Sequence, residues 1–268
     1  KPAIDCIQSW PETEQQFLQS ALFTRVTPQW DEPSANYRHG RTMTRDNKTN
    51  IFVLFALTIA SFLVYYKSFH FPWLMDDMPV IVENPDIKSF SKFLKDSYPG
   101  RPIRELSFLL DYKIFGLDPK GFHFQHILIH AINAFLVYLV SAKITRNKNI
   151  SAFTSLLFTI HPIAIEVVAN ISHRKDSLAL LFCLLSLLLF TYFLENKKYI
   201  YVISSGLCII PAFFSKQNAI AIIPVITILY IYKKTKFNKA ILASIFVLAF
   251  VVVGSVRGVQ LANNDQTL

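Results

Sequence analysis

Two adjacent carboxylates, Asp76 and Asp77, follow the first long apolar segment of the chain and are candidates for acid–base chemistry. A carboxylate beside an apolar segment can act as a general base toward a hydroxyl, or it can hold a divalent cation near a phosphate. The structural alternative is a solvated turn or a helix N-cap, where Asp is common. The dipeptide alone favours this alternative, whereas its place beside an apolar segment favours the chemical interpretation.

Three cations, Arg174, Lys175 and Lys216, fall in short connections between apolar segments. Together they would form a positive rim that suits the phosphate of a lipid carrier. Such a rim would stabilise a departing phosphate by charge, without proton transfer. For Lys216 the alternative is an ordinary lysine whose stem lies along the apolar surface while its amine reaches water.

The third long apolar segment contains His161-Pro162 near its middle and Glu166 toward its end. A glutamate inside a membrane helix is costly unless it is paired or solvated, so Glu166 is a functional candidate, with Arg174 or Lys175 as its expected partner. The alternative is a salt bridge that only fixes helix packing. If a divalent cation such as Mg²⁺ or Mn²⁺ is used, Asp76, Asp77 and Glu166 are its candidate ligands.

A polar stripe of His123, His126, His130 and Asn133 occupies one face of the preceding apolar segment, because these positions repeat with the helical period. The spacing is compatible with metal binding, but neither a cysteine nor a nearby carboxylate completes a site. We therefore favour helix packing or the lining of a cavity.

The elements that must position these residues are membrane helices. Of the 268 residues 52% are hydrophobic and only 17% are charged, which is too apolar for a soluble surface. Since a bilayer core needs about 20 apolar residues, we expect about seven spans, at residues 50–66, 122–141, 151–171, 177–194, 199–214, 218–232 and 238–256. The predicted fold class is all-α, a polytopic membrane helix bundle.

The net charge of +9 lies in short clusters and not in a basic stripe, which argues against nucleic-acid binding.

Every alternate connection is basic, which places the N-terminus in the cytoplasm and the connections at residues 67–121, 172–176 and 215–217 on the outer side. The long first outer loop contains Arg101-Pro102 between two amphipathic stretches, at residues 89–96 and 103–115. We expect residues 1–48 to be a weakly structured tail, with Met43 as the natural start. Residues 49–268 are expected to form a membrane domain truncated at its C-terminus.

Several of these motifs follow one another in the order of a known family. They are Asp76-Asp77, Asn84-Pro85, Arg101-Pro102, Leu110-Asp111-Tyr112, Phe115-Gly116-Leu117, Gly121-Phe122-His123, His161-Pro162-Ile163, Glu166-Val167 and Arg174-Lys175-Asp176. Over roughly residues 70–268 the chain resembles the membrane half of tetratricopeptide-repeat O-mannosyltransferases, which are GT-C glycosyltransferases, and their bacterial relatives. The 34-residue period of the repeats is absent, so we expect repeats beyond Leu268.

The resemblance implies a multi-pass enzyme of the endoplasmic reticulum or the bacterial inner membrane, active on the lumenal or periplasmic side. The donor would be a sugar on polyprenyl phosphate, typically mannose, and the acceptor a protein or glycan hydroxyl. Asp76 and Asp77 match the family's catalytic acidic pair. Arg174, Lys175 and Lys216 would bind the donor phosphate, with support from the residues Arg101, His123, His130, His161, Glu166 and Asp176. The expected reaction is inverting transfer by direct displacement.

Two other classes of function stay open on the residues alone. A transporter or flippase of a lipid-linked sugar would also need polar residues in its membrane helices. However, no inverted repeat is evident, and the polar residues gather toward one face. A catalytically silent membrane anchor would tolerate substitution at Asp76, Glu166 and Arg174.

Overall fold

The computed structural model describes residues 42–74, 76–96, 101–233 and 254. The expected tail before Thr42 and the expected span at residues 238–256 lie outside these residues, apart from Gly254. The chain divides into two compact units, Lys1–Asn47 and Lys48–Leu268, and the description that follows concerns the second. All regular structure in the described ranges is helical, as the composition predicts.

Three of the described helices are long and apolar enough to cross a membrane. They are α2 (Thr42–Val64, apolar from Asn47), α5 (Pro119–Thr145) and α8 (Arg174–Asn196, extended by the turn at Ile171–His173). Two shorter apolar helices follow, α9 (Tyr199–Ser215) and α10 (Ile222–Tyr232), the latter preceded by the 3₁₀ turn η6 (Gln217–Ala221). The expected total of about seven spans stays a prediction.

The segment expected as one helix at residues 151–171 is instead broken. Helix α6 (Lys148–Ile160) ends before His161-Pro162, and α7 (Ile163–Ala169) continues at an angle of 61° to it. Proline disfavours helical backbone in the residue before it, and His161 accordingly adopts an extended conformation, with ψ of 129°. If the bent pair counts as one span, the described part of the chain has four membrane-capable helices.

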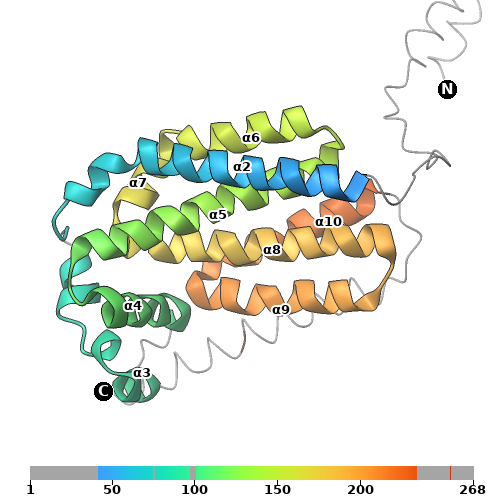
Figure 1. The fold of residues 1–268 in the computed structure, drawn as a ribbon. Helices are drawn as coiled ribbons and strands as arrows, with labels where there is room; N and C mark the ends of the chain where they lie inside the picture. Colours follow the sequence, from blue (N-terminus) through green and yellow to red (C-terminus); the bar gives the residue numbers. More distant parts are fainter. Residues whose placement is uncertain (1–41, 75, 97–100, 234–253, 255–268) are drawn as a thin grey trace, which may run out of the picture. The chain divides into compact units, whose positions relative to one another are not determined.

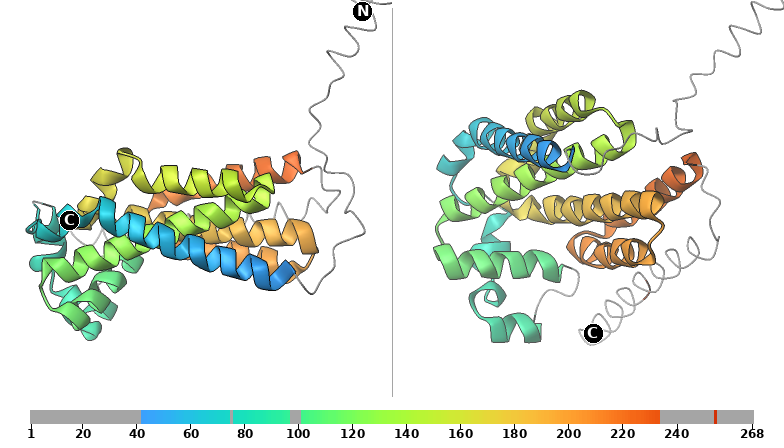
Figure 2. Two further views of the ribbon diagram at one scale, coloured as in Figure 1. Left: turned by 45° about the horizontal axis from the view of Figure 1, so that its top comes forward. Right: turned by 45° about the vertical axis from the view of Figure 1, so that its right-hand side comes forward.

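The long helices pack side by side, with α8 between α5 and α9 (Figures 1 and 2). One core cluster joins α5, α8, α9 and α10 through large apolar side chains such as Phe190, Phe193, Ile209 and Ile226. Small polar residues let α8 and α9 approach closely, and Ser186 and Ser205 share a hydrogen bond of 3.0 Å between their hydroxyls. Such contacts are typical of helix packing in membranes, where the hydrophobic effect between helices is weak.

The connection between α2 and α5, which keeps here the name of its expected side, the first outer loop, forms short helical segments at one end of the long helices (Figure 1). In order these are η2 (Tyr66–His70), η3 (Met78–Val82), η4 (Asp86–Lys88), α3 (Phe90–Asp96) and α4 (Pro102–Phe115). Helix α4 begins with a proline at its first turn, where the missing N–H costs nothing. A small core holds this layer on the starts of α5 and α8, through the buried side chains Ile81, Ile87, Phe108, Phe122 and Ile171.

Candidate functional site

Asp77 is fully buried and tied by both of its carboxylate oxygens. Its Oδ2 accepts a hydrogen bond of 3.0 Å from the backbone N–H of Leu74, within the same turn. Its Oδ1 accepts a bond of 2.8 Å from the backbone N–H of Ser172, which lies 95 residues later in the turn η5 (Ile171–His173). Burial raises the pKa of Asp77, and the two hydrogen bonds oppose that rise. Asp77 therefore clamps the first outer loop to the start of α8.

Asp76 differs from its neighbour in both exposure and partners. Its side chain is exposed, and it has no hydrogen-bond or ion-pair partner among the residues that the structure describes. Of the two carboxylates, Asp76 is thus the one that could meet a ligand without breaking contacts with the described residues.

Arg174 is fully buried, which differs from the expected position in an exposed rim. The residues expected as a loop at 172–176 form the end of η5 and the first turn of α8, so helix packing encloses the Arg174 side chain. The guanidinium forms an ion pair with Asp111 of α4, and it lies 4.8 Å from the centroid of the Phe108 ring. It also donates to the carbonyl of Phe122 at 2.7 Å and to Gln125 Oε1 at 3.2 Å.

The expected pairing of Arg174 with Glu166 is therefore not observed, because Asp111 takes that place. Glu166 lies exposed on α7, and His161 lies exposed at the break before it. Burial raises the pKa of Asp111 to about 6, although the positive charge of Arg174 acts in the opposite direction. The ion pair joins α4 of the outer loop to the start of α8.

The other cations gather around the same helix start. Lys216, which follows α9, forms an ion pair with Asp176 in the first turn of α8, and its side chain is 32% exposed. Lys175 lies close enough to Arg101, Arg104 and Lys216 for their charges to act on it. We call Arg101, Arg104, Lys175 and Lys216 the cationic rim.

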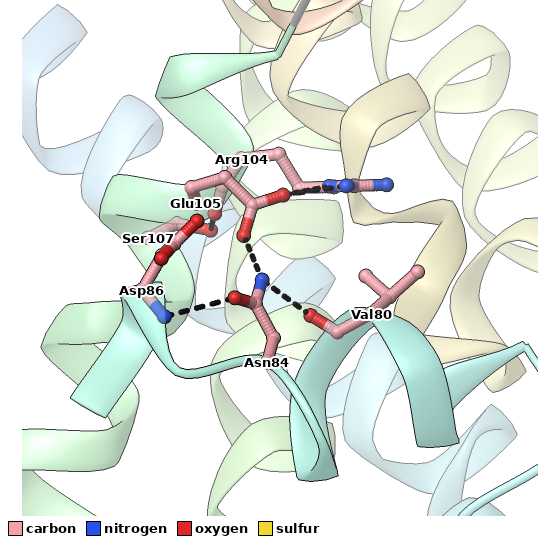
Figure 3. Close-up of polar contacts among 6 residues, drawn as sticks. All are labelled: Val80, Asn84, Asp86, Arg104, Glu105 and Ser107. Carbon is pink, nitrogen blue, oxygen red and sulfur yellow. Dashed lines mark hydrogen bonds and ion pairs between the residues drawn. The ribbon is translucent and has the colours of Figure 1, made fainter. Parts of the chain in front are cut away.

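One member of this rim, Arg104, also belongs to a polar cluster with Glu105 and Asn84, in which Arg104 and Glu105 are buried and Asn84 is half-buried (Figure 3). The Glu105 carboxylate accepts from Arg104 Nε at 3.0 Å and also from Arg104 Nη2, and its other oxygen accepts from Asn84 Nδ2 at 2.9 Å. Burial raises the pKa of Glu105, while the charge of Arg104 and the hydrogen bonds lower it.

The polar stripe of α5 faces the interior of the described helices. His123, His126, His130 and Asn133 are all buried. His126 Nε2 lies 2.9 Å from the Ser177 hydroxyl, and Asn133 donates to the Ser177 carbonyl at 2.9 Å. Through these two side chains the stripe joins α5 to α8.

No group of three or more His, Cys, Asp or Glu side chains in the described part of the chain is arranged to hold a metal ion. Asp76, Asp77 and Glu166 in particular do not form such a group.

Two functional candidates, Asp111 and Glu105, were not singled out by sequence reasoning. A signal for them exists in the helical spacing of α4, since Arg104, Phe108 and Asp111 recur at intervals that share one face. Charged residues on the same face as a buried aromatic indicate a buried ion pair, but not its partner.

Comparison with known proteins gives consistent matches. The family model described as dolichyl-phosphate-mannose-protein mannosyltransferase matches residues 107–256. The mouse protein O-mannosyl-transferase TMTC1 is 34% identical over 148 residues, which cover 49% of this chain and 15% of that protein. Human protein O-mannosyl-transferase TMTC2 is 31% identical over 153 residues, which cover 54% of this chain and 18% of the human protein. The Caenorhabditis elegans protein O-mannosyl-transferase F38B6.6 is 26% identical over 195 residues, which cover 66% of this chain and 27% of the nematode protein.

The chain therefore spans less than a third of the length of these curated relatives. No solved structure matches it significantly. The segment matched by the family model includes Asp111, Arg174 and Lys216, whereas Asp76, Asp77 and the cluster at Asn84 precede it.

Proposed function

We propose that this chain, which belongs to the dolichyl-phosphate-mannose-protein mannosyltransferase family, is the membrane part of an enzyme that transfers mannose from polyprenyl phosphate to a protein hydroxyl. The resemblance drawn from the sequence motifs is confirmed by the family match and by the TMTC relatives. Their name, protein O-mannosyl-transferase, supports mannose as the sugar and a protein as the acceptor.

The proposed reaction is a direct displacement at the anomeric carbon of the donor. The carboxylate of Asp76 takes the proton of the acceptor hydroxyl, and the acceptor oxygen forms a bond to the anomeric carbon from the side opposite the phosphate. The bond between the anomeric carbon and the phosphate oxygen breaks, and the lipid phosphate leaves with the electron pair. The configuration at the anomeric carbon is inverted.

One observation carries the proposal: the hydrogen bond from Ser172 to Asp77 brings the acidic pair to the start of α8, where the cationic rim gathers. In this proposal Lys175 and Lys216 stabilise the leaving phosphate by charge. Arg174 has a different proposed role, because it is buried against Asp111. It holds the start of α8 in place and acts on the reaction through position, not by contact with the phosphate.

The membrane-capable helices and the family support a multi-pass membrane protein. The basic connections between apolar segments support an active site on the lumenal or periplasmic side. Membrane lipid, the lipid-linked donor and the acceptor protein are the proposed partners.

The test is transfer of mannose from a polyprenyl-phosphate donor by the full-length protein carrying Asp76→Asn. We expect a loss of about 10²- to 10⁴-fold, the contribution of a positioned general base. Glu83→Gln is the matched control, since Glu83 is an exposed carboxylate of the same loop. Unchanged membrane insertion shows that the protein is still assembled.

The single variants Asp76→Asn and Asp77→Asn and the double variant separate this function from the alternatives. Retained transfer in all three would refute the assignment of the base. Movement of the lipid-linked sugar across the membrane without a new glycosidic bond would instead show a transporter. Tolerance of every substitution, with neither transfer nor movement, would show a silent anchor.

A further inference from the structure

We propose that Arg104 is an additional phosphate-contacting residue of this site, and that Glu105 and Asn84 are positioning residues that aim its guanidinium. The inference rests on the proposed function for the identity of the anion, a phosphate attached to a lipid. It adds to the site a cation that neither the motifs nor the family match includes, because the matched segment begins at residue 107.

Glu105 holds one side of the Arg104 guanidinium. Its buried carboxylate accepts from both Nε and Nη2 of Arg104, which fixes the plane of the guanidinium. A buried carboxylate is costly unless it is paired and hydrogen-bonded, and Glu105 satisfies its second oxygen with Asn84 Nδ2 at 2.9 Å. The orientation of Arg104 is therefore set by its immediate neighbour in the chain.

Asn84 in turn has no freedom to move. The same Nδ2 also donates to the carbonyl of Val80 at 3.1 Å, and its Oδ1 accepts from the backbone N–H of Asp86 at 2.9 Å. Figure 3 shows these bonds meeting at the Asn84 amide, between the segment of Val80 and the segment of Asp86. Asn84 thus joins η3, η4 and α4, and through these bonds it holds the Glu105 carboxylate in position.

The proposed phosphate contact uses the one nitrogen of the Arg104 guanidinium that makes no hydrogen bond to the described residues, Nη1. Hydrogen bonds occupy Nε and Nη2, whereas Nη1 has no partner among the residues that the structure describes. The side chain is 7% exposed, and its charge acts on Lys175 of the cationic rim. A guanidinium held at one edge is well suited to bind a phosphate oxygen at the other.

The contacts of Arg104 differ from those of a structural arginine. Arg174 shows the structural pattern, since it bonds to α4 and α5 from the start of α8. Among the residues that the structure describes, the side-chain hydrogen bonds of Arg104 go only to Glu105, on the same helix, so they join no two described elements. The link between elements is made by Glu105 and Asn84 and does not require Arg104.

The charges of the rim also favour an anion. The four cations of the rim face two carboxylates, Asp176 and Glu105, which leaves an excess of positive charge. Lys216 is already paired with Asp176 and Arg104 with Glu105. A lipid phosphate placed beside Lys175 would neutralise part of this excess.

The experiment compares Arg104→Gln with Lys113→Gln in the full-length protein in lipid nanodiscs. Lys113 is an exposed cation of the same helix, so its variant loses the same charge outside the rim. We expect Arg104→Gln to raise the KM for polyprenyl-phosphate mannose about tenfold, as expected for loss of a charge-assisted hydrogen bond, with a smaller change in kcat. Arg104→Lys should recover part of the loss. An equal KM in the two glutamine variants would overturn the proposal.

A double-mutant cycle tests the positioning role of Glu105. Glu105→Gln should raise the donor KM in the wild-type background and have no further effect on it in the Arg104→Gln background. A structural role would instead give the same effect in both backgrounds. The double variant removes both charges together, so it leaves no unpaired buried charge and is expected to fold.

Binding of farnesyl phosphate separates this inference from the proposed function. Wild-type protein that binds farnesyl phosphate but transfers no mannose would refute the function and leave the phosphate contact standing. Arg104→Gln should weaken binding of farnesyl phosphate and leave binding of farnesol unchanged. Equal weakening for inorganic phosphate would show that a free anion is recognised. Unaltered binding of both phosphates in Arg104→Gln would refute the contact.

Discussion

Asp76 and Asp77 are identical in type and adjacent in sequence, yet their surroundings assign them different roles. Asp77 is buried and accepts two backbone hydrogen bonds, so both of its carboxylate oxygens are used to fix the loop to the start of α8. Asp76 is exposed and can meet a substrate. The same contrast separates Arg174, buried against Asp111, from Lys175 at the rim. Burial and partners, more than residue type, thus separate the charged residues that we propose to position others from those that we propose to react.

The burial of Asp111 predicts a pH dependence of stability. Since burial raises the pKa of Asp111 to about 6 in the folded protein, the folded state binds its proton more tightly than the unfolded state, where the pKa is near 3.8. Its contribution to stability is therefore fully present below about pH 4 and is lost as the pH rises to about 6. The change amounts to roughly 3 kcal/mol in the free energy of unfolding.

The measurement is the Tm of the detergent-solubilised protein between pH 4.5 and 7.5, for the wild type and Asp111→Asn. The Tm of the wild type relative to this variant should fall as the pH rises through about 6 and then stay level. Glu83→Gln, at an exposed carboxylate, should track the wild type at every pH. A constant difference between wild type and Asp111→Asn over the whole range would contradict a raised pKa at Asp111.

The residues that perform these roles were only partly predictable from the sequence. Asp76, Asp77 and the charges at 174–176 could be identified because they border apolar segments, where charge is unusual. Their partners could not, since Asp77 bonds to Ser172 across 95 residues and Arg174 bonds to Asp111 across 63. A one-dimensional pattern contains no information about which of several acids a buried arginine will meet.

At the scale of elements, the turn between α4 and α5 brings two helices close together at Gly121. A Cβ atom at this position would overlap the side chain of Phe115, at both its Cβ and its ring. We expect Gly121→Ala to destabilise the protein by about 1–3 kcal/mol, because a clash close to the backbone cannot be relieved by rotating the far end of a side chain.

Thermal unfolding of Gly121→Ala in detergent measures this effect. The double variant Gly121→Ala, Phe115→Ala removes the overlapping ring and should recover part of the loss relative to Phe115→Ala alone. If Gly121→Ala destabilises the protein equally with and without the Phe115 ring, the overlap is not the cause. Wild-type stability in Gly121→Ala would show that the turn relaxes freely.

Hydrophobic patterning predicted the existence and order of the described helices, but not their continuity. Helices α5, α8 and α9 cover the expected segments at residues 122–141, 177–194 and 199–214, each extended by a few residues. The prediction of one continuous helix at residues 151–171 was wrong, since the helix breaks at His161-Pro162. A proline in an apolar run is compatible with a kinked or a broken helix, and only the surrounding packing selects between them.

At the scale of the whole molecule, the start of α8 is where the separate parts of the site come together. Ser172 binds Asp77 of the first outer loop, Arg174 binds Asp111 of α4, and Asp176 binds Lys216 after α9. Three alternate residues at one helix start thus make contacts with three other parts of the chain. The loop around Asp77, helix α4 and the connection after α9 are therefore held in fixed positions relative to one another. The proposed reaction needs such fixed positions, because preorganised groups stabilise a transition state without having to move.

This arrangement serves the proposed reaction only if the start of α5, next to the site, lies on the outer side of the membrane. Helix α5 has 27 residues, or about 40 Å at 1.5 Å per residue, and therefore spans a hydrocarbon core of about 30 Å. Its two ends should be exposed on opposite sides. Lys120, at the start, and Asn149, just beyond the end, are exposed positions at which a cysteine can report the side.

The last prediction uses a protein whose native Cys6, Cys183 and Cys208 are replaced by serine. In sealed vesicles with the cytoplasmic face outward, an impermeant maleimide should label Asn149→Cys at once, because the basic residues around it mark the cytoplasmic side. Lys120→Cys should react only after detergent opens the vesicles. The reverse pattern would place Asp76 and the cationic rim in the cytoplasm, and immediate labelling of both positions would show that α5 does not span the membrane.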